Sequence, residues 1–162
     1  MNKKVKRIWV FGKVGSGKTT LAHKISEKLK IPVYSTDDFV YKQKWSEKFS
    51  EPDKIKNLKK FSKKSSWVIE GAHAGEWILP GLKRAEVIFL LNLSKRKLLC
   101  QIIKRHKERL KTNSDNLLGL LKLLWWAIRD TLSEYMKYKN LDIPFLILSN
   151  TKEVSNMLNS LK

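Results

Sequence analysis

GKVGSGKTTL, residues 12–21, is the most informative stretch of this sequence. It follows directly on the apolar run 8–11 and leads into a segment with apolar residues at Leu21, Ile25 and Leu29. Apolar residues spaced by four predict a helix, so the glycine-rich stretch connects a buried strand to a helix. A glycine-rich turn at the start of a helix presents backbone N–H groups that attract an anion.

The spacing within this stretch indicates which anion is bound. Gly12, Gly17, Lys18 and Thr19 match the phosphate-binding P-loop pattern G-x-x-x-x-G-K-[ST] in full. The pattern predicts that Lys18 faces the β- and γ-oxygens of a nucleoside triphosphate and that the Thr19 hydroxyl binds Mg²⁺. A structural glycine turn that binds nothing is the alternative interpretation. The predicted nucleotide-binding residues of the loop are Gly12, Lys13, Val14, Gly15, Ser16, Gly17, Lys18, Thr19 and Thr20.

Apolar runs and helical patterns alternate along the chain. Strands are predicted at 5–11, 32–36, 67–69, 87–91 and 144–148. Helices are predicted at 18–30, 51–64, 94–111, from the end of the polar break 112–115 to about 138, and from 151 onward. Strands that alternate with helices imply βαβ units. We therefore expect an α/β fold with a mostly parallel sheet, in one domain that spans residues 1–162.

The composition limits the classes of partner and location. A net charge of +19 favours nucleic acid or an anionic membrane as a partner, but the lysines are spread over the whole chain, as on a solvated surface. Nothing resembles a DNA-reading motif, so only non-specific nucleic-acid binding is expected. The longest apolar stretch, 117–128, is too short to span a membrane. Cys100 is the single cysteine, which is typical of a cytoplasmic protein.

Acidic residues follow two of the predicted strands. Asp37 and Asp38 end the second strand, and Glu70 ends the third. Because ligands of open parallel sheets bind beyond the carboxyl ends of the strands, these carboxylates are expected near the phosphates if the first three strands are neighbours in the sheet. One carboxylate would hold Mg²⁺, and another would orient or deprotonate an acceptor hydroxyl. For Asp37 and Asp38, a helix cap with charge in the first turn is the alternative.

Three arginines complete the candidate site. Arg105 and Arg109 lie four residues apart on one helix, and Arg129 lies on the next helix. Two basic helices joined by a polar break predict a lid that closes over the triphosphate, with solvated surface arginines as the alternative. Trp125 and Trp126 are interpreted as lid or core packing, or else as a partner-binding surface. No histidine has metal-ligand spacing, and none receives a catalytic role.

Three stretches together are similar to a known family. They are IWVFGKVGSGKTTLAHKISEKLKIPVYSTDDFVYKQKW from residue 8, WVIEGAHAGEW from residue 67, and AEVIFLLNLSKRKLLCQIIKRHKERLK from residue 85. They resemble the small adenylate-kinase-related P-loop proteins labelled DNA topology modulation (FlaR-like) proteins. The specific parts are the P-loop, the pattern of Asp37, Tyr41 and Trp45, and the W-[IV]-I-[DE]-G stretch.

The resemblance implies a nucleoside-kinase-like, five-stranded parallel sheet flanked by helices, with a helical lid at about 111–129. It places Asp37 in the acceptor site and Glu70 near Mg²⁺. It also implies an adenine-facing loop around residues 149–152, which adds Asn150 and Lys152 to the predicted nucleotide-binding residues. Glu70 stands where Asp is more usual, and His73 stands where Tyr is common. The second departure leaves the identity of the acceptor open.

The sequence therefore predicts a P-loop phosphotransferase that uses Mg²⁺ and ATP and acts on an unidentified small-molecule or nucleotide acceptor. The alternative is an ATP-binding regulatory protein that associates with nucleic acid and turns over slowly. ATP and GTP are not distinguished, and the oligomeric state stays open. The predicted metal-binding residues are Thr19 and Glu70, and the predicted catalytic residues are Lys18, Asp37, Arg105, Arg109 and Arg129.

Overall fold

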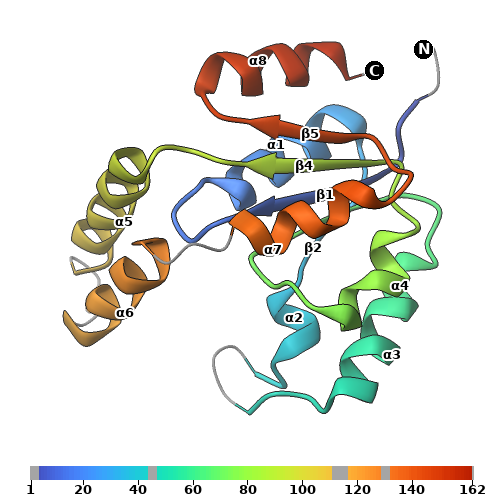
Figure 1. Ribbon diagram of the computed structural model, residues 1–162, viewed down its shortest axis with the longest axis horizontal. Coiled ribbons are helices and arrows are strands. Elements are labelled where there is room, and N and C mark those ends of the chain that lie inside the picture. Colours follow the sequence, from blue (N-terminus) through green and yellow to red (C-terminus); the bar gives the residue numbers. More distant parts are fainter. Residues whose placement is uncertain (1–3, 44–46, 111–116, 129–131, 162) are drawn as a thin grey trace.

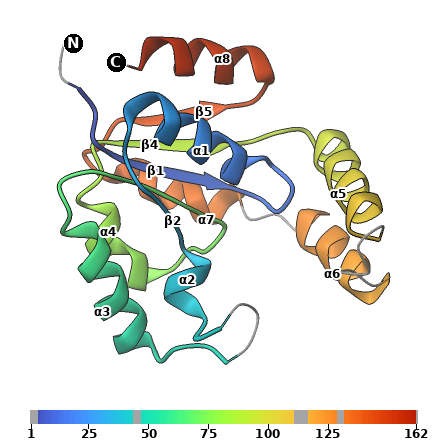
Figure 2. The same ribbon diagram turned by 180° about the vertical axis from the view of Figure 1, so that it is seen from behind.

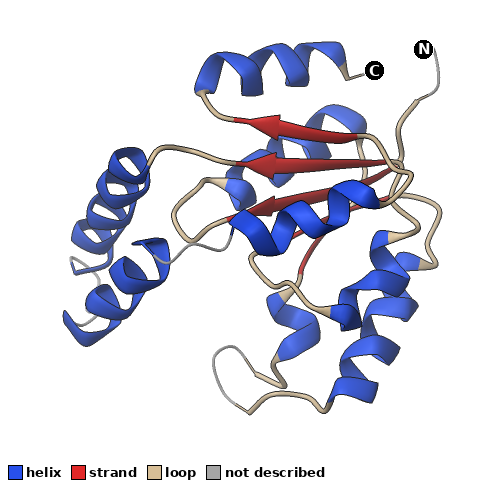
Figure 3. Cartoon of the chain, viewed as in Figure 1, coloured by secondary structure: helices blue, strands red, loops and turns tan. Residues whose placement is uncertain are grey.

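A parallel sheet forms the centre of the molecule. The computed structural model describes residues 4–43, 47–110, 117–128 and 132–161. Within these residues the strands are β1 (Arg7–Gly12), β2 (Val33–Ser35), β3 (Trp67–Gly71), β4 (Val87–Leu91) and β5 (Phe145–Leu148). They form a five-stranded sheet in the order β2-β3-β1-β4-β5, and every neighbouring pair is parallel (Figures 1 and 3). The predicted α/β fold is confirmed.

Helices cover both faces of the sheet. Ile8 and Val10 of β1 pack into one core with α1 (Lys18–Leu29) and α8 (Thr151–Ser160). Trp9 and Phe11 point to the opposite face, because alternate residues of a strand face opposite sides. There they pack with α2 (Asp37–Val40), α3 (Glu51–Ser62), α4 (Leu79–Leu82) and α7 (Leu132–Met136). Burial on both faces explains why β1, β3 and β4 are continuous apolar runs.

Two further helices lie beyond the sheet. α5 (Lys95–Leu110) and α6 (Leu117–Ile128) lie side by side, next to the carboxyl ends of β1 and β4 (Figures 1 and 2). Short 3-10 turns at η1 (Glu76–Ile78) and η2 (Lys137–Asn140) complete the elements of the described residues. The predicted lid, 111–129, lies partly outside these residues, and its described part is α6. Whether this segment closes over a ligand stays a prediction.

The prediction of one long helix reaching residue 138 is wrong. The structure divides this segment into α6, α7 and η2. The two parts have different packing partners: α6 packs against α5, whereas Tyr135 and Tyr138 place their rings 5.0 and 5.4 Å from Phe11 of β1. The four-residue helices α2 and α4 are not predicted, because they are too short to give a helical apolar period.

Candidate active site

The loop between β1 and α1 has the geometry of an anion-binding turn. Gly15 and Gly17 have φ angles of +77° and +83°, in the left-handed region that favours glycine. Gly17 occupies the N-cap of α1 and makes no side-chain capping hydrogen bond. The first N–H groups of α1 are therefore not satisfied by a cap and point toward the loop, where a phosphate would be bound.

The same loop is held in place by α5. A Cβ atom added to Gly15 would lie 2.7 Å from Cγ1 of Ile102 and 3.1 Å from the carbonyl oxygen of Leu98. Ile102 and Leu98 are buried. Glycine at this position therefore allows the close approach of α5 to the loop, and it connects the predicted phosphate site to the helix that carries Arg105 and Arg109.

Lys18 lies among charged groups from three other elements. Burial lowers the pKa of the Lys18 ammonium, while the negative charges of Glu70 and Asp37 raise it and the positive charge of Arg105 lowers it further. Residues 37, 70 and 105 are far apart in the sequence, so the fold brings them to the P-loop lysine. An ammonium that is partly desolvated interacts more strongly with phosphate oxygens than one in bulk water.

Glu70 and Thr19 together form the candidate metal site. Glu70 is 5% exposed, and its Oε1 accepts a hydrogen bond of 3.1 Å from the Thr19 hydroxyl. Its other oxygen, Oε2, is buried and has no hydrogen-bond partner among the described residues. Burial raises the pKa of the Glu70 carboxyl, although Lys18 acts in the opposite direction. An unpartnered buried carboxylate oxygen beside a hydroxyl fits a Mg²⁺ ion, which prefers oxygen ligands.

Asp37 and Asp38 are separated by their surroundings. Both lie in the first turn of α2, but the N-cap is Thr36, whose side chain makes no capping hydrogen bond, so only the first-turn part of the helix-cap alternative is met. Asp38 is exposed, whereas Asp37 is half-buried and its Oδ1 lies 3.0 Å from Nε2 of His73. The charge of Asp37 also acts on both Lys18 and Glu70. Of the two aspartates, Asp37 is therefore the one that faces the P-loop.

His73 is noted in the sequence as a departure from the family pattern, but its pairing with Asp37 is not predicted there. It follows β3 by two residues, and its ring lies 6.2 Å from the Tyr41 ring and 6.3 Å from the Trp77 ring. Two tyrosines hold this segment: the Tyr135 hydroxyl donates to the carbonyl oxygen of Ala72 at 2.8 Å, and Gly75 N–H donates to the Tyr138 hydroxyl at 2.8 Å. The available sequence signal was its position immediately after the strand-end acid.

The structure describes most of the remaining predicted site residues, but not all of them. Arg105 is on the exposed side of α5, and its charge acts on Lys18. Arg109 belongs to α5, and Arg129 lies outside the described residues. Asn150 caps α8, because its Oδ1 accepts a hydrogen bond of 2.9 Å from Glu153 N–H. Lys152 is exposed in the first turn of that helix. Nucleotide contacts of Asn150 and Lys152 stay predictions.

A hollow of about 510 Å³ lies beside the P-loop. It joins Lys13 of the loop to Ser149 of the predicted adenine-facing loop, as expected for the base-binding side of a nucleotide site. Its lining residues are Lys13, Asn92, Leu93, Ser94, Lys95, Leu98, Leu132 and Ser149.

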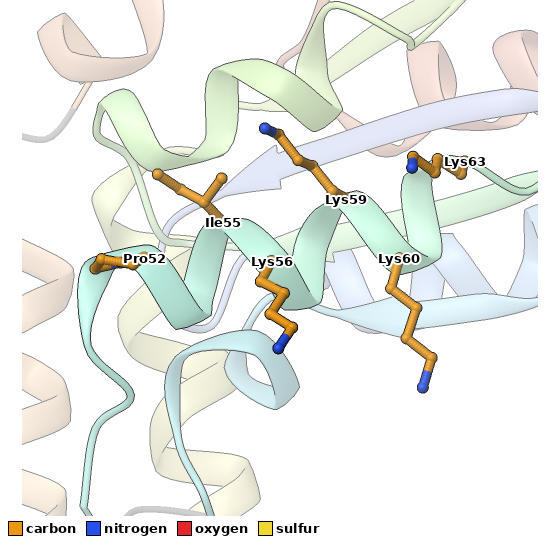
Figure 4. A pocket seen from close by; sticks show the side chains of 6 residues that line it. All are labelled: Pro52, Ile55, Lys56, Lys59, Lys60 and Lys63. Atoms are coloured by element: carbon orange, nitrogen blue, oxygen red, sulfur yellow. The ribbon is translucent and has the colours of Figure 1, made fainter.

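A second hollow, of about 580 Å³, lies on the surface of α3. Lys56, Lys59, Lys60 and Lys63 line it together with Pro52 and Ile55, and Lys56 and Lys60 extend to the same side of the helix (Figure 4). Its lining includes no carboxylate and no residue of the P-loop. It is a basic surface rather than part of the candidate active site.

Comparison with known proteins identifies the fold class. No protein-family model matches the chain, and no curated protein matches its sequence. Shikimate kinase from Bacteroides thetaiotaomicron is similar in structure, with a TM-score of 0.62, 15% identity and coverage of 97% of this chain and 96% of that chain. Shikimate kinase from Acinetobacter baumannii, solved in complex with shikimate, gives a TM-score of 0.63 at 14% identity over 96% of this chain and 89% of that chain.

A gluconokinase from Sinorhizobium meliloti 1021 is also similar, with a TM-score of 0.56, 13% identity and coverage of 98% of this chain and 90% of that chain. All three similarities extend over nearly the whole chain. The chain therefore shares its α/β fold, a five-stranded parallel sheet flanked by helices, with these solved structures.

Proposed function

We propose that this protein is a phosphotransferase that uses Mg²⁺ and ATP and acts on a small acceptor with a free hydroxyl group. The observation that carries the proposal is the grouping of Lys18 with two carboxylates of different character, Glu70 and Asp37. Glu70 is buried beside Thr19, and Asp37 is half-buried beside His73. Phosphoryl transfer needs both positions, one for the metal and one for the acceptor.

Each residue has a distinct task in this proposal. When bound, Mg²⁺ and ATP supply the phosphoryl group and neutralise part of its charge. The Ser16 N–H donates to the Lys13 carbonyl oxygen at 3.1 Å, and the other N–H groups of residues 13–19 would bind phosphate oxygens, with Lys18 Nζ adding a point charge. Thr19 Oγ1 and Glu70 Oε2 hold the metal, directly or through water.

Asp37 acts on the acceptor. Its carboxylate would accept a hydrogen bond from the acceptor hydroxyl and take its proton as the hydroxyl oxygen bonds to the transferred phosphorus and ADP leaves. The bond to His73 Nε2 occupies Oδ1 and fixes the direction of the other oxygen. Arg105 is close enough to Lys18 for its charge to act there, which supports a role in stabilising the transferring group. Arg109 of α5 and Arg129 of the predicted lid segment are proposed to join it.

Two similarities support this class of reaction without naming the acceptor. The structural neighbours are named as shikimate kinases and a gluconokinase, which are kinases of small hydroxylated molecules. The sequence resemblance to the FlaR-like proteins supports the same P-loop class. The pairing of His73 with Asp37 is the feature of this chain that we expect to set its acceptor preference.

The direct test is a screen of small hydroxyl and phosphate acceptors for ADP release from ATP. The proposal predicts release that depends on Mg²⁺ and on one class of acceptor, and that is lost in Lys18→Ala. A slow release that no acceptor stimulates, together with ATP-dependent binding of DNA, would favour the regulatory alternative. The four-lysine surface of α3 is the observation that keeps this alternative in the test.

A further inference from the structure

The helix α6 carries apolar side chains on both of its faces. Leu120, Leu123 and Leu124 are half-buried and Ala127 is buried, on the side opposite to the exposed residues. The outer face of α6 consists of the exposed Lys122 and five apolar residues, Leu117, Leu118, Leu121, Trp125 and Trp126, with exposed fractions of 66, 70, 54, 58 and 48%. A helix that is apolar all round is normally buried, so this outer face is built to be covered by something.

The adjacent helix adds positive charge to this apolar surface. Arg96, Ile103, Lys107 and Leu110 follow one another at intervals of seven, four and three, so they share one side of α5. All four are exposed, Ile103 by 42% and Leu110 by 49%. Together α5 and α6 contain eight basic residues and a single acidic one, Glu108. The pair of helices therefore combines exposed apolar side chains on α6 with exposed basic side chains such as Arg96 and Lys107 on α5.

We propose that α5 and α6 dock on the surface of an anionic lipid bilayer. The charge complementarity selects this partner: lysine and arginine side chains attract anionic head groups, while leucine side chains enter the boundary between head groups and acyl chains. Tryptophan is enriched at that boundary, because its ring is apolar and its N–H is polar. Trp125 and Trp126 pack edge to face in the middle of the exposed surface.

The dimensions favour a helix that lies on the membrane over one that crosses it. The 12 residues of α6 extend about 18 Å, which is shorter than the hydrocarbon core of a bilayer. Among the described residues, no helix is long and apolar enough to cross a membrane. A second copy of the chain is a poorer occupant, because each copy carries a net charge of +19 and would bring the same basic helices to the contact.

The test is co-sedimentation of the full-length protein with large unilamellar vesicles. We expect binding to phosphatidylcholine vesicles that contain phosphatidylglycerol, and weak binding to pure phosphatidylcholine. The double variant Leu121→Ser/Trp125→Ser should lose about tenfold or more in partition coefficient, because two large side chains no longer enter the bilayer. The matched control is Leu146→Ser, which removes a leucine that is 41% exposed on β5 and should bind like the wild type.

A second pair of variants tests the charge. Lys107→Glu on α5 should lower the partition coefficient about fivefold or more. Lys24→Glu, an equal charge reversal at an exposed position of α1, should have a much smaller effect. Thermal melting checks that each variant is folded, and the single variant Leu118→Ser replaces the double variant if the latter does not fold.

Three outcomes would overturn the proposal. The first is no sedimentation with anionic vesicles. The second is sedimentation that the α6 variants leave unchanged. The third is a wild-type dimer in solution that the α6 variants convert to a monomer while vesicles bind neither form, which would assign the outer face to a second copy of the chain.

Discussion

Replacing Glu70 by glutamine separates the stability of the empty protein from its affinity for metal. The change keeps the size of the side chain and an oxygen that accepts the Thr19 hydrogen bond, but it removes the charge. Burial raises the pKa of Glu70 above its ordinary value of 4.5 even though Lys18 attracts the carboxylate. The cost of desolvation therefore exceeds the attraction, so the charged carboxylate lowers the free energy of unfolding in the absence of metal.

The sign of the pH dependence follows from the same shift. The folded protein binds more protons at Glu70 than the unfolded chain does, between the ordinary pKa and the raised one. The free energy of unfolding of the wild type therefore falls as the pH rises through this window, and that of Glu70→Gln does not. Glutamine still buries a polar group. At a pH above the raised pKa we therefore expect Glu70→Gln to raise the free energy of unfolding by about 1 kcal/mol, the low end for an unpartnered buried group.

For a chain of 162 residues this gain corresponds to a melting temperature about 2–4 °C higher. Mg²⁺ should reverse the order: the variant should lose about 10- to 100-fold in metal affinity in the presence of an ATP analogue. Thermal melts between pH 4 and 8, with and without Mg²⁺ and the analogue, measure both effects. Glu27→Gln, which changes an exposed glutamate of α1, is the control. A variant that melts no higher than the wild type without metal, and that keeps the full Mg²⁺ response, would refute this reasoning.

Three further predictions concern the P-loop and the charge. Lys18→Ala should weaken ATP binding by about 2–4 kcal/mol, measured by calorimetry, because a desolvated charge partner is lost; equal affinity would mean that the loop is only a structural turn. Gly15→Ala should lower the free energy of unfolding more than Gly17→Ala, because both need a left-handed backbone but only the first meets Ile102; equal losses in chemical denaturation would contradict the close approach of α5. Binding to duplex DNA should weaken roughly a thousandfold or more between 50 and 200 mM salt and differ no more than a few-fold between sequences, because it rests on phosphate contacts; a thousandfold sequence preference at fixed salt would support the regulatory alternative.

The local features of the fold could be predicted because they are written in short stretches of sequence. The P-loop pattern locates the end of β1 and the start of α1, and apolar runs locate β1, β3 and β4. Each of these patterns needs only a few neighbouring residues. The position of β3 between β2 and β1 is a tertiary feature. It brings Asp37 and Glu70 to the same side of Lys18, which the sequence predicted only on the condition that these three strands are neighbours.

The parts that could not be predicted depend on contacts between distant segments. His73 and Asp37 are 36 residues apart, and no spacing rule connects a histidine after one strand to an aspartate after another. The different surroundings of α6 and α7 are also tertiary features, because α6 packs against α5 whereas Tyr135 and Tyr138 pack on the sheet. The exposure of Trp125 and Trp126 has the same origin. An apolar helical sequence favours burial of the helix, but it does not tell which face of the helix another segment covers.

The most direct test of the proposed phosphotransferase is the effect of Asp37→Asn on acceptor-dependent turnover, measured beside its affinity for ATP. Asp37 faces His73 and Lys18, whereas the neighbouring Asp38 is exposed and serves as the matched control. We expect Asp37→Asn to lower turnover about a hundredfold or more with nearly unchanged ATP affinity, and Asp38→Asn to behave like the wild type. Full turnover in Asp37→Asn would mean that the two aspartates only begin α2, and it would contradict the assignment of Asp37 to the acceptor.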